Sequence, residues 1–141
     1  MNVYEAKNIR NLTIAGHAGA GKTTFIEAML FHAGVNNRMG TVEDNNTTSD
    51  FHELEQERSN SIFATLIELE YKGVKLNFFD TPGFDDFIGE MIAPMHVSDT
   101  GLIMVNAQNG IEVGTENAFS YADKLKNCVI FAVNKLDQEK A

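Results

Sequence analysis

Residues 16–23 read Gly16-His17-Ala18-Gly19-Ala20-Gly21-Lys22-Thr23, and this stretch decides the fold. It fits the pattern G-x-x-x-x-G-K-[ST], follows a candidate strand over residues 11–15 and opens a candidate helix over residues 22–32. Glycines let backbone N–H groups turn inward around a phosphate, and the following helix directs its positive end at the same anion. The stretch therefore predicts a phosphate-binding loop, in which Lys22 reaches the terminal phosphates and Thr23 ligates Mg²⁺. The alternative is a glycine-rich turn that caps a helix and binds nothing.

The composition is that of one globular domain. The chain has 141 residues, of which 43% are hydrophobic and 22% charged. No run of apolar residues is long enough for a membrane span, and the first residues show no secretory signal, so we expect a cytoplasmic protein without membrane contact. The formal net charge of −9 argues against a general basic face for nucleic acid. The single cysteine, Cys128, cannot form an internal disulfide, and we expect it to pack as a small hydrophobe.

Strands and helices are expected to alternate along the chain. Strands are predicted over residues 11–15, 62–71, 74–80, 101–106 and 127–133, and helices over 22–32, 87–97 and 115–125. A tight turn at Lys72-Gly73 makes an antiparallel pair of the second and third strands, and Gly34 suits a helix C-terminus. Continuous apolar strands between helices indicate a largely parallel sheet covered on both faces.

Side chains are assigned to the core from the same patterns. In the first helix, Phe25, Met29 and Leu30 are spaced as one buried face. The remaining expected core residues are Tyr71, Phe78, Phe79, Phe131, Met91, Met95 and Met104. The polar stretch 35–61 is long enough to be functional or mobile, and Asp50 and Glu53 have the spacing of a helix capping box within it. The acidic run Glu53–Glu57 favours a solvated helix face over a metal site.

Two further motifs follow strands. Asp80-Thr81-Pro82-Gly83 ends the third strand, where a carboxylate can hold Mg²⁺ through water and the Gly83 N–H can reach a γ-phosphate. Residues 86–89 fit the same D-x-x-G pattern, but Asp86 is expected to start a helix. Asn134-Lys135-Leu136-Asp137 follows the last strand, where a carboxylate can accept the N1–H and N2–H donors of guanine. Alone, this last segment favours an ordinary connection bearing surface charges; together with the two earlier motifs in this order, it favours guanine recognition.

In this order the three motifs are the G1, G3 and G4 elements of GTPases, and the flanking residues narrow the resemblance. The stretches concerned are Ile9-Arg10-Asn11, Thr23-Thr24, Leu30–Val35, Gln56-Glu57-Arg58, Asp80–Gly83 with Asp86-Phe87, and Val133–Asp137. Together they resemble the G domain of elongation factor G and its relatives, which include elongation factor G-like proteins, tetracycline-resistance ribosomal protection proteins and peptide chain release factor three. The resemblance implies an α/β fold of the Ras-like P-loop NTPase type, a three-layer α/β/α arrangement with strand order 2-3-1-4-5.

The resemblance also implies ligands and partners. It implies GTP or GDP with Mg²⁺ as cofactors and the ribosome as a partner of the full-length parent, without sequence-specific contact to nucleic acid. The implied nucleotide-binding residues are Gly16, His17, Ala18, Gly19, Ala20, Gly21, Lys22, Thr23, Thr24, Asp80, Gly83, Asn134, Lys135 and Asp137. The implied metal ligands are Thr23, Ser61 and Asp80, with Ser61 at the position of a threonine of the family.

Three departures from the family bear on catalysis. Phe84 stands where the family has a histidine that positions the attacking water, and phenylalanine has no donor or acceptor for water. Gly19 replaces a common aspartate, and Ser59-Asn60 replaces Gly-Ile before Ser61. We therefore expect weak hydrolysis. Of the two catalytic positions, Lys22 and Phe84, only Lys22 carries a side chain that can take part. The alternatives are that His17 or His96 supplies the water contact, or that the chain serves a nucleotide-dependent ribosome-binding switch or ribosomal protection-type protein without useful GTPase activity.

Residues 1–141 are expected to be an incomplete G domain. They hold the G1, switch I, G3 and G4 elements, whereas a family G domain continues to a further strand and a G5 loop and then to more domains. A sheet that stops before its last strand exposes an edge, so self-association of the fragment is a further expectation.

Overall fold

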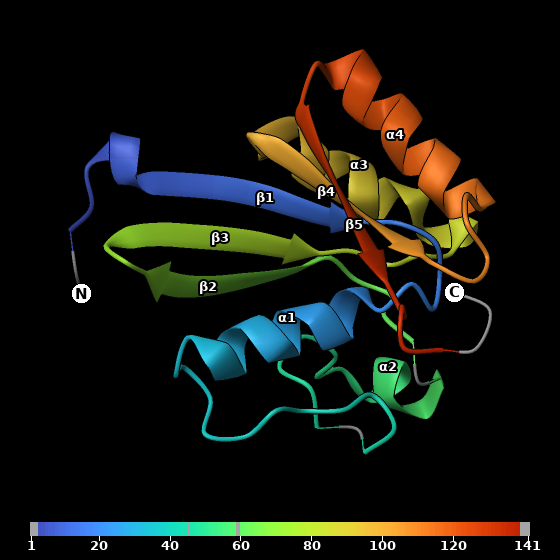
Figure 1. The fold of residues 1–141 in the computed structure, drawn as a ribbon, viewed down its shortest axis with the longest axis horizontal. Helices are drawn as coiled ribbons and strands as arrows, with labels where there is room; N and C mark the ends of the chain where they lie inside the picture. Colours follow the sequence, from blue (N-terminus) through green and yellow to red (C-terminus); the bar gives the residue numbers. More distant parts are fainter. Residues whose placement is uncertain (1–2, 45, 59, 139–141) are drawn as a thin grey trace.

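The computed structural model of the chain describes residues 3–44, 46–58 and 60–138, and a five-stranded sheet runs through it (Figure 1). The strands are β1 (Ile9–Ala15), β2 (Thr65–Tyr71), β3 (Val74–Asp80), β4 (Thr100–Asn106) and β5 (Cys128–Asn134). Their spatial order is β2-β3-β1-β4-β5, and only the β2–β3 pair is antiparallel. The expected strand order and the single antiparallel pair are confirmed.

Helices cover both faces of this sheet. The α-helices are α1 (Lys22–His32), α2 (Glu53–Arg58), α3 (Ile88–Val97) and α4 (Val113–Leu125), with short 3-10 turns at Ala6–Asn8 and Asp85–Phe87. Figure 1 shows α1 on one side of the sheet and α3 and α4 on the other. The three-layer arrangement is therefore confirmed. No helix in the described ranges is both long and apolar enough to cross a bilayer.

The alternation of side chains along β4 explains the two cores. Leu102 and Met104 point to the α1 side, where they pack with Ile26 and Leu30. Ile103 points to the other side and packs against α3 and α4. Because successive residues of a strand face opposite ways, one apolar strand stabilises both layers.

Two connections follow from local chemistry as expected. Lys72 and Gly73 turn β2 into β3 with φ angles of 51° and 79°, the left-handed pair that a two-residue hairpin requires. Gly34 follows the C-cap of α1 with φ 73°, and the N–H groups of Gly34 and Val35 donate to the carbonyls of Phe31 and Leu30 at 3.0 Å each. This pair of bonds satisfies carbonyls that the helix end leaves unpaired.

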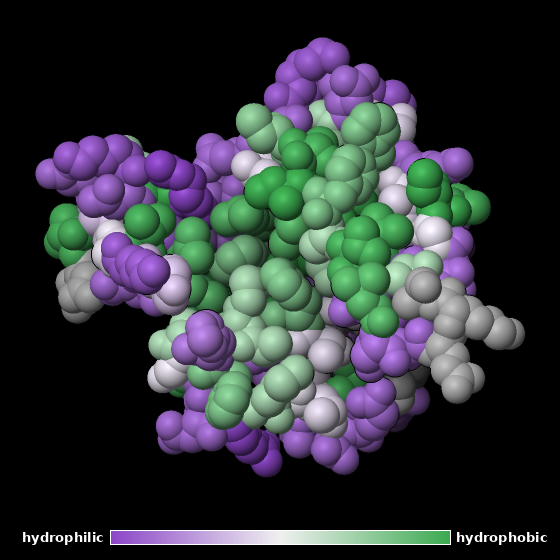
Figure 2. Space-filling model, viewed as in Figure 1, coloured by the Kyte–Doolittle hydropathy of each residue, from purple (hydrophilic) through white to green (hydrophobic). Residues whose placement is uncertain are grey.

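Several predicted core positions are wrong. β5 lies at the end of the strand order and is half exposed, with Phe131 54% exposed and Cys128 at the surface. Tyr71 is 45% exposed, whereas Phe78, Met91, Met95 and Met104 are buried as predicted. An apolar sequence is compatible with an outer strand because burial depends on what packs against it, and here Phe131 meets only the ring of Phe119, 5.9 Å away, among described aromatic side chains. Figure 2 shows the resulting apolar surface in the region of β5.

The buried face of α1 also differs from the prediction. Its most buried apolar residues are Ile26 and Leu30, whereas Phe25 and Met29 are partly buried at the edge of that core. Between Ile26 and Leu30 lies Glu27, which is only 1% exposed. Because Glu27 occupies the inner face, the apolar residues of the sequence point to a different helix face from the one that is buried.

Candidate nucleotide-binding site

The loop between β1 and α1 has the backbone of a phosphate cradle. Gly16 and Gly21 adopt φ angles of 134° and 92°, which favour glycine. A Cβ at Gly16 would lie 2.4 Å from the carbonyl oxygen of Met104, so a larger residue does not fit there. Nζ of Lys22 donates to the carbonyls of Gly16 and His17 at 3.0 Å each. Burial lowers the pKa of Lys22 to about 8, although the carboxylates of Asp80 and Asp50 oppose that shift.

The Asp80-Thr81-Pro82-Gly83 segment packs directly on this loop. Asp80 is the last residue of β3, and its Oδ2 accepts a hydrogen bond from Thr23 Oγ1 at 2.9 Å. Thr81 Oγ1 donates to the carbonyl of Ile14 at 2.7 Å and ties the segment to β1. At Gly83, a Cβ would meet Lys22 Nζ at 2.4 Å, so the absence of a side chain allows this close approach.

The three predicted metal ligands come together. Thr23 Oγ1 lies 2.9 Å from Asp80 Oδ2 and 3.3 Å from Ser61 Oγ. The other oxygen of Asp80, Oδ1, is buried without a hydrogen-bond partner among the described residues. Burial raises the pKa of Asp80 to about 6, against the opposing effects of Lys22 and of the hydroxyls of Thr23 and Ser49. Two hydroxyls and an unsatisfied carboxylate oxygen are hard ligands of the kind that Mg²⁺ prefers, so these residues fit the ion.

A pocket of about 400 Å³ joins the motifs. Its lining residues come from the phosphate loop, the polar stretch 42–61, the Gly83 segment and the residues after β5: Ala18, Gly19, Gly21, Lys22, Thr23, Thr24, Val42, Glu43, Asp50, Asn60, Ser61, Gly83, Phe84, Lys135 and Gln138. Phe84 presents its ring at this wall, 43% exposed. Segments far apart in the sequence thus enclose one volume, and Phe84 belongs to its lining.

Only part of the Asn134-Lys135-Leu136-Asp137 segment lies at the site. Asn134 Nδ2 donates to the carbonyl of Ala20 at 3.0 Å and so links β5 to the phosphate loop. Gly21 accommodates this contact, because a Cβ there would lie 2.3 Å from Asn134 Nδ2. Lys135 lines the pocket with φ 62°, whereas Asp137 is exposed and lies outside the pocket lining.

The sequence comparison identifies the family to which this arrangement belongs. Residues 7–141 match the family described as the elongation factor Tu GTP-binding domain. The chain belongs to this family.

Individual relatives of this GTP-binding domain include an elongation factor G-like protein and a tetracycline resistance protein. The chain is 35% identical over 135 residues to an elongation factor G-like protein of Thermotoga maritima and 36% identical over 131 residues to the tetracycline resistance protein TetO of Campylobacter jejuni. These matches cover 96% and 93% of the chain but 19% and 20% of the relatives, so the chain spans about a fifth of their length.

Solved structures support the same assignment. A crystal structure of a Thermus thermophilus protein superposes with a TM-score of 0.92 at 34% identity, covering 94% of the chain and 20% of that protein. The bacterial selenocysteine-specific elongation factor EF-Sec, at 22% identity and a TM-score of 0.70 over 89% of the chain and 20% of its own, supports the fold. The predicted resemblance to elongation factor G-like GTP-binding domains and the predicted fold are confirmed.

The structure adds a carboxylate to the GTP-binding domain's pocket that the sequence did not indicate. Asp50 is 6% exposed, lines the pocket, and its Oδ2 has no hydrogen-bond partner within the described ranges. Burial raises its pKa, while a hydrogen bond from Ser61 opposes the shift. Asp50 lies in a polar stretch without periodicity, where one aspartate among many gives no signal of burial.

The short helix α2 corrects two predictions. It begins at Glu53, and the N–H of His52 donates to Glu55 Oε2 at 3.4 Å, so the predicted Asp50–Glu53 capping box is wrong. Glu55 is 1% exposed and Oε1 accepts the N–H groups of Ile62 and Phe63 at 2.9 and 3.1 Å, so the helix is not acidic and solvated all round. These bonds hold residues 62–63 off the sheet, which explains why β2 starts at Thr65 rather than residue 62. The predicted departure at Ser59 lies outside the described residues.

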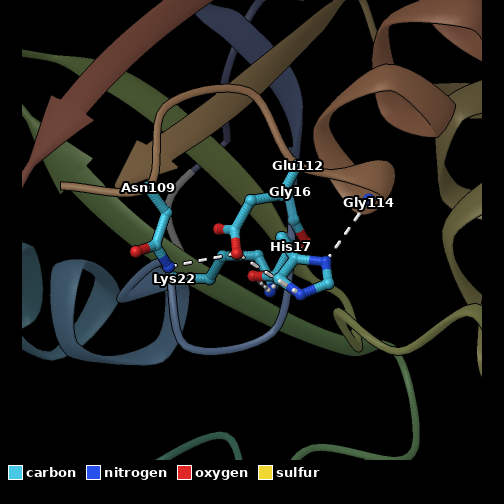
Figure 3. A network of polar contacts seen from close by, with 6 residues as sticks. All are labelled: Gly16, His17, Lys22, Asn109, Glu112 and Gly114. Atoms are coloured by element: carbon cyan, nitrogen blue, oxygen red, sulfur yellow. Dashed lines mark hydrogen bonds and ion pairs between the residues drawn. The ribbon is translucent and has the colours of Figure 1, made fainter. Parts of the chain in front are cut away.

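The two histidines considered for water positioning lie elsewhere. The His17 imidazole turns toward α4: Nδ1 accepts the N–H of Gly114 at 3.3 Å, and Nε2 lies 3.7 Å from Glu112 Oε1 (Figure 3). Asn109 Nδ2 donates to the same Glu112 oxygen at 3.1 Å. His96 lies in the last turn of α3, whose C-terminus leads into the start of β4, the sheet end opposite the phosphate loop. Neither histidine lines the pocket.

Proposed function

We propose that this domain binds GTP and GDP together with Mg²⁺, and that it hydrolyses GTP weakly. The observation that carries the proposal is the convergence of Thr23, Ser61 and Asp80 beside the phosphate loop, with an unsatisfied carboxylate oxygen among them. A glycine-rich turn that merely capped a helix would need no such cluster. The family to which the chain belongs supports the nucleotide, and the donor set supports the ion.

The phosphates would be held by the loop itself. Backbone N–H groups of residues 16–21 and the N-terminus of α1 attract anions, and Lys22 supplies a positive charge. Lys22 now donates to two loop carbonyls, which a phosphate oxygen would replace as partners. Gly83 lies close enough to the lysine for its N–H to serve the same phosphate.

Mg²⁺, when bound by Thr23, Ser61 and Asp80, would neutralise phosphate charge. Ser61 and Asp80 each place an oxygen within 3.3 Å of Thr23 Oγ1, so the three side chains could hold one ion. Asn134 and Asp137 are proposed to recognise guanine, with Asn134 bracing the loop through Ala20 and Asp137 accepting the two N–H donors of the base.

Weak hydrolysis follows from Phe84. Phosphoryl transfer depends on positioning a water molecule, and a phenyl ring offers that water neither donor nor acceptor. Phe84 lines the pocket, while His17 is bound to Gly114 and His96 lies at the far end of the sheet. The same observation favours the second candidate, a nucleotide-dependent ribosome-binding switch without useful GTPase activity, and the similarity to a tetracycline resistance protein is compatible with it.

The longer protein is proposed to be a ribosome-associated translation factor. In it, residues 1–141 would supply the G1, switch I, G3 and G4 elements, and other parts would contact the ribosome. This proposal rests on the relatives, since the chain spans about a fifth of their length.

GTP turnover by the full-length protein with ribosomes tests the proposal, using wild type and Phe84→His. We expect slow turnover in wild type and a gain of about 100-fold in the variant, the scale of one positioned catalytic group. Phe119→His is the matched control, because Phe119 is a comparably exposed phenylalanine on α4. Fast wild-type turnover would contradict weak hydrolysis, and a lack of gain in Phe84→His would favour the binding switch.

A further inference from the structure

One carboxylate of α1 holds two distant points of the polar loop that precedes α2. Glu27 Oε2 accepts the N–H of Gly40 at 3.0 Å, and Oε1 accepts the N–H of Thr48. The Glu27 side chain is 1% exposed, and its bond to the Gly40 N–H is fully buried, whereas the bond to Thr48 is partly buried. Hydrogen bonds to a buried carboxylate are stronger than those between neutral groups, and the charge needs them to compensate for lost hydration.

The loop is built to receive this side chain. A Cβ at Gly40 would lie 2.7 Å from both Glu27 Oε2 and the carbonyl oxygen of Asn46, so the backbone passes too close for any other residue. Thr41 N–H donates to Asn46 Oδ1 at 2.7 Å, which closes the loop on itself. The carboxylate therefore holds a folded segment rather than a loose strand of chain.

The segment that Glu27 holds forms one wall of the nucleotide pocket. Val42 and Glu43 line the pocket between the two points of attachment, and Asp50 lines it two residues after Thr48. Ser49, between Thr48 and Asp50, is also fixed, since its carbonyl accepts a hydrogen bond from Thr65 Oγ1 at 3.1 Å. A change at Glu27 would thus reach the pocket wall without touching the phosphate loop.

Glu27 also shares a face of α1 with a proposed metal ligand. It lies four residues after Thr23, and residues at that spacing lie on the same side of a helix. Thr23 contacts Ser61 and Asp80, and Ser61 lines the same pocket as Asp50. The wall held by Glu27 therefore adjoins the oxygen cluster, where Mg²⁺ and the terminal phosphate would bind.

We propose that Glu27 is a positioning residue that holds the segment formed by residues 40–44 and 46–50 against the pocket and so favours GTP·Mg²⁺ over GDP, an inference that rests on the proposed function. The loop glycines hold the inner phosphates, and Lys22 reaches the terminal phosphate of either nucleotide, whether or not the segment is in place. The segment contributes at the side of the oxygen cluster, so its loss weakens the triphosphate complex with the ion more than the diphosphate complex.

Titrations of this chain with a non-hydrolysable GTP analogue and with GDP, each with and without Mg²⁺, test the inference in wild type and Glu27→Gln. Glutamine keeps one acceptor oxygen, but its NH₂ group then faces one of the two backbone N–H groups that the carboxylate binds. We expect affinity for the analogue with Mg²⁺ to fall about tenfold, the scale of one charged hydrogen bond. Affinity for GDP, and for either nucleotide without Mg²⁺, is expected to change by less than about twofold on the same scale. Glu53→Gln is the matched control, since Glu53 is an exposed glutamate of α2.

Gly40→Ala disturbs the same contact from the loop side and leaves Glu27 in place. We expect it to reproduce the selective loss, and we expect the double variant to lose less than the sum of the two, as for residues in contact. Equal losses for GTP and GDP, or wild-type affinities in both variants, would overturn the inference while leaving the proposed function intact. The inference would also be overturned if the Glu27→Gln chain failed to fold while the Gly40→Ala chain bound both nucleotides with wild-type affinity. A wild-type chain that binds neither nucleotide would contradict the proposed function, and this inference with it.

Discussion

Asp80 Oδ2 accepts a hydrogen bond from Thr23 Oγ1 at 2.9 Å, although the two residues are 57 positions apart in the sequence. The contact joins the end of β3 to the start of α1, the two elements that parallel pairing of β1 with β3 places side by side. Because Asp80 is 1% exposed and one of its oxygens is unsatisfied in the described structure, the carboxylate is held where a cation would stabilise it.

Asp80→Asn is expected to stabilise the nucleotide-free chain at pH 7. Burial raises the pKa of Asp80 from 3.8 to about 6, so the folded chain keeps a proton that the unfolded chain loses across that range. Stability from this group is therefore greatest below pH 4 and falls as the pH rises to 6. The variant lacks that decline and should be more stable at pH 7 by about 3 kcal/mol. Urea unfolding from pH 4 to 7 measures the difference, and parallel curves for the two proteins would contradict it.

Lys22→Met should separate stability from binding. Burial lowers the pKa of Lys22 to about 8, so at pH 7 its charge destabilises the nucleotide-free fold, and this cost disappears as the pH rises from 8 toward 10.5. The variant should melt at a higher temperature than wild type at pH 7 and at nearly the same temperature above pH 10. Its affinity for GTP should fall at least about 100-fold, because the positive charge that contacts the terminal phosphates is lost. A lower melting temperature at pH 7 would show that the bonds to Gly16 and His17 outweigh the burial of charge.

Asp137→Ala should reduce discrimination between GTP and ATP. Asp137 is exposed in this structure and is proposed to accept the N–H donors of guanine. We expect the preference for GTP over ATP to fall at least about tenfold in competition titrations, the scale of a lost charged hydrogen bond. Asp123→Ala, at an exposed aspartate of α4, is the control. An unchanged preference in Asp137→Ala would place base recognition elsewhere.

Lys126→Gly should stabilise the fold. Lys126 ends α4 with φ 60°, a left-handed conformation that glycine adopts without strain. Its ion pair with Asp123 is exposed and weak. Relief of a left-handed strain of about 1–2 kcal/mol, less the backbone entropy that glycine loses, predicts a gain of about 0.5–1 kcal/mol in the free energy of unfolding. Lys124→Gly, inside α4, should instead cost about 1 kcal/mol. If both substitutions destabilise equally, the conformation of Lys126 carries no strain.

The arrangement of strands was predictable because several local signals agreed. The phosphate-loop pattern gave the bounds of α1, and Lys72-Gly73 required a hairpin. Continuous apolar strands separated by helices indicated parallel pairing, whereas the strand order β2-β3-β1-β4-β5 was implied by the family resemblance. The positions of Asp80 and Asn134 at strand ends followed from the same interpretation, since both come directly after apolar runs.

Burial was the part that local patterns could not predict. Phe131 lies in an apolar strand, yet it is half exposed because β5 is outermost among the described strands. Asp50, Glu27 and Glu55 are charged, yet all three are buried. Their partners include backbone N–H groups and hydroxyls 7 to 21 positions away, and no spacing rule for helices or strands relates residues over such distances.

Calorimetric titration of the 141-residue chain with GDP and GTP in Mg²⁺, with ATP as the control, tests the central claim most directly. The pocket is lined by the phosphate loop, Thr23, Ser61 and Lys135, and Asp80 is hydrogen-bonded to Thr23. This arrangement predicts binding of both guanine nucleotides and much weaker binding of ATP. An absence of binding at millimolar nucleotide, or equal affinity for ATP, would contradict the claim that these residues form a guanine nucleotide site.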